Sequence, residues 1–71
     1  MKLKAICLNI AKARIQKGLS AYELSLRIDK TASYISKLEN GRINPSLKTI
    51  LAICDELHIH PATLFEERSE R

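Results

Sequence analysis

Residues 20–40 decide the fold, and they read SAYELSLRIDKTASYISKLEN. The segment opens on Ser20 with Glu23 three residues later, the S-x-x-E signature of a capping box. In that motif the serine hydroxyl accepts from the backbone N–H of Glu23 and the carboxylate reaches back to Ser20. Leu24 and Ile28 follow at a spacing of four and share one helix face. A short amphipathic helix is therefore predicted directly after Ser20.

The chain then turns at residues 29–30, and a second helix is predicted from Ala32 to Asn40. Thr31 is its expected N-cap, because a threonine hydroxyl can accept from the free N–H groups of the first turn. Gly41 is expected to end this helix at the C′ position, where a left-handed backbone costs glycine least. The segment thus reads as helix, tight turn, helix.

The angle between these two helices is expected to be set by apolar contacts among Leu24, Ile28, Ile35 and Leu38. Two helices joined at about 90–120° by a short turn form a helix-turn-helix, whose second helix fits the DNA major groove. The same apolar pattern also occurs in an ordinary helical corner. The spacing alone therefore leaves both interpretations open.

A longer helix is predicted before this segment, over residues 3–17, with Gly18 as its C-terminal stop. Its inward face carries residues spaced by three and four, as an amphipathic helix requires. These are Leu3, Ile6, Cys7, Ile10, Ala13 and Arg14.

Two further helices are predicted after the segment. Asn44-Pro45 breaks the chain, Ser46 caps a fourth helix, and residues 58–60 form a turn. The inward residues expected in the fourth helix are Leu47, Ile50, Leu51, Cys54 and Leu57. Pro61 opens a short last helix that carries Leu64 and Phe65. The result is an all-α fold of five helices in a single domain over residues 1–66, with a polar C-terminal tail over residues 67–71.

The charge distribution points to an anionic partner. The net charge is +4, but residues 1–48 hold ten Lys or Arg against three acidic residues, and residues 49–71 hold two against five. A basic body with an acidic tail favours nucleic acid as the partner. Cys7 and Cys54 occupy apolar helix positions, which is typical of buried thiols in a reducing cytosol. No run approaches 18 apolar residues, so neither a signal peptide nor a membrane span is expected.

The run from Tyr34 to Ser46, YISKLENGRINPS, resembles the Cro/C1 family of lambda-repressor-like (XRE-type) helix-turn-helix transcriptional regulators. Leu24-Ser25 in the preceding helix belongs to the same likeness. The likeness covers nearly the whole chain, because it also includes Arg14, Gly18, Leu57, Leu64 and Phe65.

The resemblance implies a compact five-helix domain that binds double-stranded DNA sequence-specifically and acts as a transcriptional repressor in the cytoplasm, on the nucleoid. It further implies a homodimer on palindromic half-sites about one helical turn apart. An enzymatic activity, a cofactor, a metal, a membrane partner and a small-molecule effector are not implied. Control by protein level or by a partner is expected instead.

The resemblance also assigns roles to residues. The third helix would read base edges through Ala32, Ser33, Tyr34, Ser36 and Lys37. Phosphates would be bound at both ends of the unit, through Ser20, Ala21, Tyr22, Lys30, Asn40, Gly41 and Arg42. Lysine can donate to guanine, serine hydroxyls to either base, and an alanine methyl can meet thymine. Lys30 could equally be a free surface lysine.

A structural ion pair between Arg14 and Glu39 is also implied, clamping the first helix to the third through two hydrogen bonds. Three positions depart from the family pattern. Ala21 stands where Gln is common, Ser25 where Ala is usual, and Asp29 where the turn often has Gly. Asp tolerates the left-handed region better than most residues. These departures bear on base specificity more than on the fold.

Two other classes of function, and the dimer contacts, stay open at this stage. Cys54, His58 and His60 have a spacing that can bind metal, although a fourth ligand is not evident. A protein-interaction module, such as an antitoxin or an anti-repressor, could use the same fold. Dimerisation could use Ile59, Leu64 and Phe65, which could equally complete the monomer core.

Overall fold

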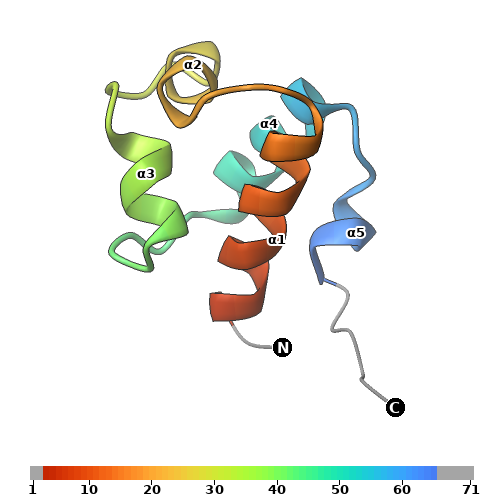
Figure 1. The fold of residues 1–71 in the computed structure, drawn as a ribbon. Coiled ribbons are helices and arrows are strands. Elements are labelled where there is room, and N and C mark those ends of the chain that lie inside the picture. Colours follow the sequence, from red (N-terminus) through yellow and green to blue (C-terminus); the bar gives the residue numbers. More distant parts are fainter. Residues whose placement is uncertain (1–2, 66–71) are drawn as a thin grey trace.

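The computed structural model describes residues 3–65, with side chains from residue 4 onward, and these residues form five α-helices and no strand (Figure 1). The helices are α1 (Leu3–Gln16), α2 (Ala21–Arg27), α3 (Tyr34–Glu39), α4 (Leu47–Leu57) and α5 (Pro61–Phe65). The predicted all-α, five-helix class is confirmed. The predicted tail over residues 67–71 lies outside the described residues. No helix among the described residues has the length and apolar character that crossing a membrane requires.

The core forms where α1 meets the other helices. In Figure 1, α1 stands between the α2–α3 unit on one side and α5 on the other, and it contacts α3, α4 and α5. Seven apolar side chains have no exposed surface and fill the centre: Ile10, Leu24, Ile35, Leu38, Ile53, Leu57 and Leu64. Every helix contributes one or two of these residues, so α2 and α3 are held against the body of the protein.

Serine hydroxyls cap two of the helices. Ser20 Oγ accepts from the backbone N–H of Glu23 at 2.9 Å, and Ser46 Oγ accepts from that of Thr49 at 3.2 Å. The predicted caps are therefore present, but the capping box at Ser20 is only half formed. The Glu23 carboxylate contacts Arg27 Nη2 at 3.5 Å, because Arg27 lies one helical turn further on the same exposed face.

The first four helices end in the same way. A residue with left-handed backbone follows each helix, with φ of 74° at Gly18, 62° at Asp29, 76° at Gly41 and 55° at His58. At every end, the N–H of that residue bonds to the carbonyl three positions back, and the next N–H bonds to the carbonyl five positions back. This pair of bonds is the Schellman motif, which satisfies helix carbonyls with backbone donors alone. The predicted stops at Gly18 and Gly41 agree with it.

The start of α3 differs from the prediction. The helix begins at Tyr34, and Ala32 and Ser33 lie in the turn before it. Thr31 is not the N-cap: Ser33 is, and its side chain makes no capping hydrogen bond. The Thr31 carbonyl accepts from the Tyr34 N–H at 3.0 Å and closes the turn. A hydrogen bond from the Ile35 N–H to the hydroxyl of Ser25 on α2 holds the first turn of α3 instead.

Two residues predicted to face inward from α4 are exposed. Leu47 and Leu51 keep 63% and 45% of their surface, whereas Ile53, which the prediction omitted, is fully buried. Successive helix residues are rotated by 100°, so a buried face through Ile50, Ile53 and Leu57 turns Leu51 away from the core. α4 therefore carries apolar residues on more of its surface than the face that it buries.

Candidate nucleic-acid interface

Ser25 joins α2 and α3, the two helices of the predicted helix-turn-helix. Its side chain is fully buried at the crossing of α2 and α3. Ser25 Oγ donates to the carbonyl of Ala21 at 2.7 Å and accepts from the backbone N–H of Ile35 at 2.9 Å. The hydroxyl thus supplies, from another helix, the acceptor that α3 lacks at its own N-cap. The sequence signals only that residue 25 is small, which is why this role was missed.

The short helix α3 has one buried face and one exposed face. Ile35 and Leu38 have no exposed surface and anchor it in the core. Ser36 and Lys37 lie on the opposite, exposed face, and Ala32 and Ser33 are exposed in the turn that leads into it. The predicted base-reading residues are therefore brought together at one end and one side of α3. A helix presented in this way has the shape that fits a major groove.

Tyr34 is only half-buried, packs against the core and also contacts a cation. Lys30 Nζ lies 5.2 Å from the centre of its ring, the geometry of a cation–π contact. The sequence left open whether Lys30 binds phosphate or is a free surface lysine. Its contact with Tyr34 shows that it is not free. The contact holds a positive charge beside the first turn of α3, and no sequence pattern predicts it.

The expected ion pair between Arg14 and Glu39 is present as a two-point contact. Arg14 Nε lies 2.7 Å from Glu39 Oε2, and Nη2 donates to Oε1 at 3.0 Å. The two side chains keep only 15% and 12% of their surface exposed. The hydrogen bonds that Arg14 donates to Glu39 raise the pKa of Arg14 above its ordinary value, so the guanidinium stays charged. Its charge also neutralises the acidic side chain nearest to the exposed end of α3.

Arg14 also connects the two predicted phosphate-binding segments. Its Nη1 donates to the carbonyl of Leu19 at 2.8 Å, directly before Ser20. Its other donors hold Glu39, directly before Asn40. The first segment, residues 20–22, forms the start of α2, where Ser20 and Tyr22 are exposed. The second, residues 40–42, follows α3 and is exposed throughout. One guanidinium therefore sets the spacing between the two segments.

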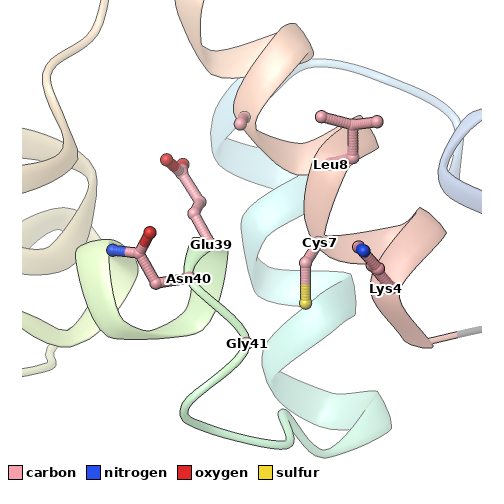
Figure 2. Close-up of a pocket in the computed structure, with 7 residues that line it drawn as sticks. Lys4, Cys7, Leu8, Glu39, Asn40 and Gly41 are labelled. Atoms are coloured by element: carbon pink, nitrogen blue, oxygen red, sulfur yellow. The ribbon is translucent and has the colours of Figure 1, made fainter.

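A hollow of about 530 Å³ lies between α1 and the C-terminal end of α3 (Figure 2). Lys4, Cys7 and Leu8 line it from α1, and Glu39, Asn40 and Gly41 line it from the other side. Burial, together with the charge of Glu39, raises the pKa of the Cys7 thiol. Burial also raises the pKa of Cys54. Both cysteines are free and buried, so both thiols stay protonated at neutral pH.

The C-terminal half contains the suggested dimer contacts and the suggested metal ligands. Leu64 has no exposed surface and belongs to the monomer core, so its suggested role as a dimer contact is wrong. Ile59 and Phe65 are half-buried and pack against the same core. In the suggested metal site, His60 Nδ1 accepts from the backbone N–H of Ala62 at 3.0 Å, and Cys54 is buried. Within residues 3–65, no three His, Cys, Asp or Glu side chains gather to hold a metal ion.

Comparison with known proteins gives consistent likenesses. A family model described as helix-turn-helix matches residues 10–64. The chain is 31% identical over 67 residues to the uncharacterized HTH-type transcriptional regulator y4dJ of Sinorhizobium fredii, covering 94% of this chain and 87% of y4dJ. It is 36% identical over 67 residues to the uncharacterized HTH-type transcriptional regulator YozG of Bacillus subtilis, covering 93% of this chain and 80% of YozG.

A solved structure shares the arrangement of the helices. The restriction-modification controller protein C.AhdI from Aeromonas hydrophila superposes with a TM-score of 0.82 at 33% sequence identity. The superposition covers 89% of this chain and 96% of that protein.

Proposed function

Because the chain belongs to the Cro/C1-type family of helix-turn-helix proteins and is a DNA-binding transcriptional regulator, we propose that it inserts α3 into the major groove of a two-fold symmetric operator and represses transcription there. The observation that carries this proposal is the two-sided character of α3. Ile35 and Leu38 are fully buried, and Ser36 and Lys37 face outward beside the turn of Ala32 and Ser33.

The exposed side chains suit base edges of different kinds. Lys37 would donate to guanine O6 and N7, and Ser33 and Ser36 would use their hydroxyls. Ala32 offers a methyl group to thymine, and Tyr34, beside Lys30, would contact the DNA near the start of the helix. These short side chains make few contacts, so each base pair should contribute little discrimination by itself.

Phosphate contacts would fix the orientation of α3. Residues 20–22 present the first N–H groups of α2 to one phosphate, and residues 40–42 present Asn40, Gly41 and Arg42 to another. The Arg14 contacts to Leu19 and Glu39 support this part of the proposal, because they hold both segments at one separation. Such contacts supply affinity without sequence information. With a DNA operator as target, the protein would act in the cytoplasm on the nucleoid.

The first experiment asks whether binding is electrostatic and selective. Selection from a random duplex library should yield a palindromic sequence, and its affinity should fall with rising salt at a log–log slope of about −0.9 per phosphate contacted. An absence of binding to any duplex at low salt would overturn the proposal. A reporter gene placed behind the selected sequence should be repressed.

The second experiment assigns the base-reading face. Lys37→Ala should reduce the preference for the selected duplex over a mismatched one by about tenfold, corresponding to roughly 1.4 kcal/mol. Lys12→Ala serves as the matched control, because Lys12 is an exposed lysine on α1, away from this face. Equal discrimination by both variants would remove Lys37 from the reading face.

A further inference from the structure

Two of the leucines that the core leaves uncovered, Leu47 and Leu51, lie on one exposed stripe of α4. Leu47 and Leu51 are four residues apart, and they keep 63% and 45% of their surface exposed. Lys48 and Asp55 are exposed on one flank of this stripe. The α4 stripe is defined here as Leu47, Lys48, Leu51 and Asp55. One exposed face of α4 thus places two neighbouring apolar side chains beside two opposite charges.

We propose that the α4 stripe is the contact between two copies of this chain, packed with their α4 helices antiparallel about a two-fold axis next to Leu51. This inference rests on the proposed binding to a two-fold symmetric operator and names the surface that would join the two copies.

Charge complementarity supports a second copy as the occupant. Lys48 and Asp55 are seven residues apart, about 10 Å along the helix, and Leu51 lies between them. Around a two-fold axis at this midpoint, Lys48 of each copy stands opposite Asp55 of the other, and Leu51 meets its own symmetry mate. The stripe is therefore complementary to itself, as an isologous contact requires. Within residues 3–65, neither Lys48 nor Asp55 has an ion-pair partner.

Two other exposed apolar pairs do not have this property. Tyr22 and Leu26 on α2 keep 61% and 48% of their surface exposed, but the charges beside them, Glu23 and Arg27, already form an ion pair with each other. Leu8 and Ile15 lie on one face of α1 and keep 55% and 65% of their surface exposed. The charged residues beside them are Lys4 and Lys12. Two copies meeting there would bring like charges together, which opposes association.

The position of the α4 stripe is also compatible with binding to one DNA molecule. The flank of α4 that carries Lys48 continues to Ala52 and Glu56, and Glu56 lies 3.9 Å from Arg27 on α2. A two-fold axis perpendicular to α4 keeps this flank on the same side in both copies. Both α2–α3 units would then lie on one side of the dimer, where a single duplex could meet both.

The contact is small, so the dimer should be weak in solution. A stable interface covers about 800 Å² on each partner, and two leucines with two charged neighbours cover less. The expected dissociation constant is on the order of tens of micromolar or weaker. Two copies would therefore assemble mainly on the operator.

Sedimentation equilibrium of the full chain tests this inference without DNA. Leu51→Lys should weaken dimerisation by about tenfold or more, because it places two like charges at the axis. Ile15→Lys is the matched control, since it adds the same charge at a more exposed residue of α1, and it should dimerise like the wild type. Circular dichroism should report the same melting temperature for the monomers. Wild-type protein that stays monomeric, or equal association of the two variants, would overturn the inference.

A charge exchange tests the antiparallel register. Lys48→Glu and Asp55→Lys should each weaken the dimer about twofold to fivefold, in keeping with exposed ion pairs. The double variant has the wild-type net charge and restores the pairing in reversed order, so it should dimerise within about twofold of the wild type. A double variant as weak as the product of the two single effects would overturn this register.

Binding to DNA then separates this inference from the proposed function. The Leu51→Lys variant should bind an isolated half-site as well as Ile15→Lys does, but lose cooperativity on the full palindrome. Equal cooperativity of both variants would overturn the α4 contact and leave the proposed function intact. Failure of the wild type to bind any duplex would overturn the proposed function, while sedimentation would still report on the contact.

Discussion

At the scale of single residues, Arg14 serves three segments at once. It binds Glu39 through Nε and Nη2 and the carbonyl of Leu19 through Nη1. Removing either partner of the ion pair leaves a charge in surroundings that are largely closed to water. This loss costs more than the net contribution of the pair itself.

The first prediction follows from this asymmetry. Glu39→Leu should lower the free energy of unfolding by roughly 2–3 kcal/mol, somewhat below the value for fully buried pairs, because both side chains keep some exposure. The double variant Arg14→Met/Glu39→Leu should be less destabilised than the single one. Urea unfolding of the two single variants and the double variant checks this order. A double variant that shows the sum of the single effects would contradict the coupling.

The second prediction concerns the two buried thiols and pH. Burial raises the pKa of Cys7 and Cys54 above the ordinary value of 9.0, so the folded state holds these protons when the unfolded state has released them. The stabilisation is complete below pH 9.0 and is lost as pH rises through the folded pKa values. The free energy of unfolding should therefore fall above pH 9, by up to about 1.4 kcal/mol per pH unit for each thiol.

The control for this pH dependence is the double variant Cys7→Ala/Cys54→Ala. It should be less stable at neutral pH, because of the space left in the core, but its stability should change less steeply above pH 9. Thiolate ultraviolet absorbance of the native wild type should rise at higher pH than that of the urea-unfolded chain. Identical titration of the two states would refute the assignment.

At the scale of helices, α3 depends on a hydroxyl from α2. Ser25→Ala should cost about 1–3 kcal/mol, because the N–H of Ile35 would lose its acceptor while it remains buried. Ser33→Ala is the matched control, since Ser33 is exposed and its side chain makes no capping bond, and it should change little. Thermal unfolding measures both variants, and hydrogen exchange at Ile35 should accelerate only in the first.

The left-handed helix ends give a pair of opposite effects. Gly41→Ala should destabilise the protein by about 1 kcal/mol through its φ of 76° alone, because an added Cβ would meet no atom within 4 Å. Asp29→Gly should instead remove the cost of a φ of 62° and stabilise the fold by up to about 1 kcal/mol. Chemical unfolding compares the two. Equal signs would show that side-chain contacts, rather than backbone conformation, decide stability at these ends.

The starts and ends of the helices show which parts of the fold could be predicted from the sequence. Starts and stops such as Ser20, Gly18 and Gly41 were predictable, because a cap acts on residues within one turn of itself. The start of α3 was not, since the acceptor for the Ile35 N–H is the hydroxyl of Ser25, ten residues earlier on another helix. The contact of Lys30 with Tyr34 likewise depends on the path of the turn between them.

The burial of α4 shows a second limit. Leu47, Ile50, Leu51 and Ile53 are all apolar, and helical spacing fits more than one inward face. Only the positions of the neighbouring helices choose among these faces. The exposed face of α3, with the residues predicted to read bases, could be predicted correctly. Ile35 and Leu38 define a single buried face on this short helix.

At the scale of the whole molecule, the two ends of the described chain are joined. Asn9 Nδ2 on α1 donates to the carbonyl of Leu64 on α5 at 2.9 Å, and the Leu64 side chain is fully buried. The last helix therefore completes the core that α1 begins. Without it, α1 and α4, which both contact α5, would lose part of their cover.

A final prediction follows from this closure. Leu64→Ala should cost about 2–5 kcal/mol, because it leaves a cavity in the core. Leu51→Ala should cost far less, since that side chain is 45% exposed. The loss at Leu64 should be the same at every protein concentration in thermal unfolding. A loss that diminished with increasing concentration would mean that Leu64 is buried between copies instead.

The backbone-closed helix ends have a consequence for how such a protein could change over evolutionary time. The end of α3 is satisfied by main-chain groups and by the Asn40 side chain, which donates to the carbonyl of Ser36. Its first turn is satisfied by Ser25 from another helix. In residues 3–65, no hydrogen bond or ion pair involves the side chains of Ser33, Ser36 or Lys37. These positions are thus free to drift without a penalty in folding. A duplicated copy of this gene could acquire a new target sequence through a few substitutions there, while every structural constraint stayed elsewhere in the chain.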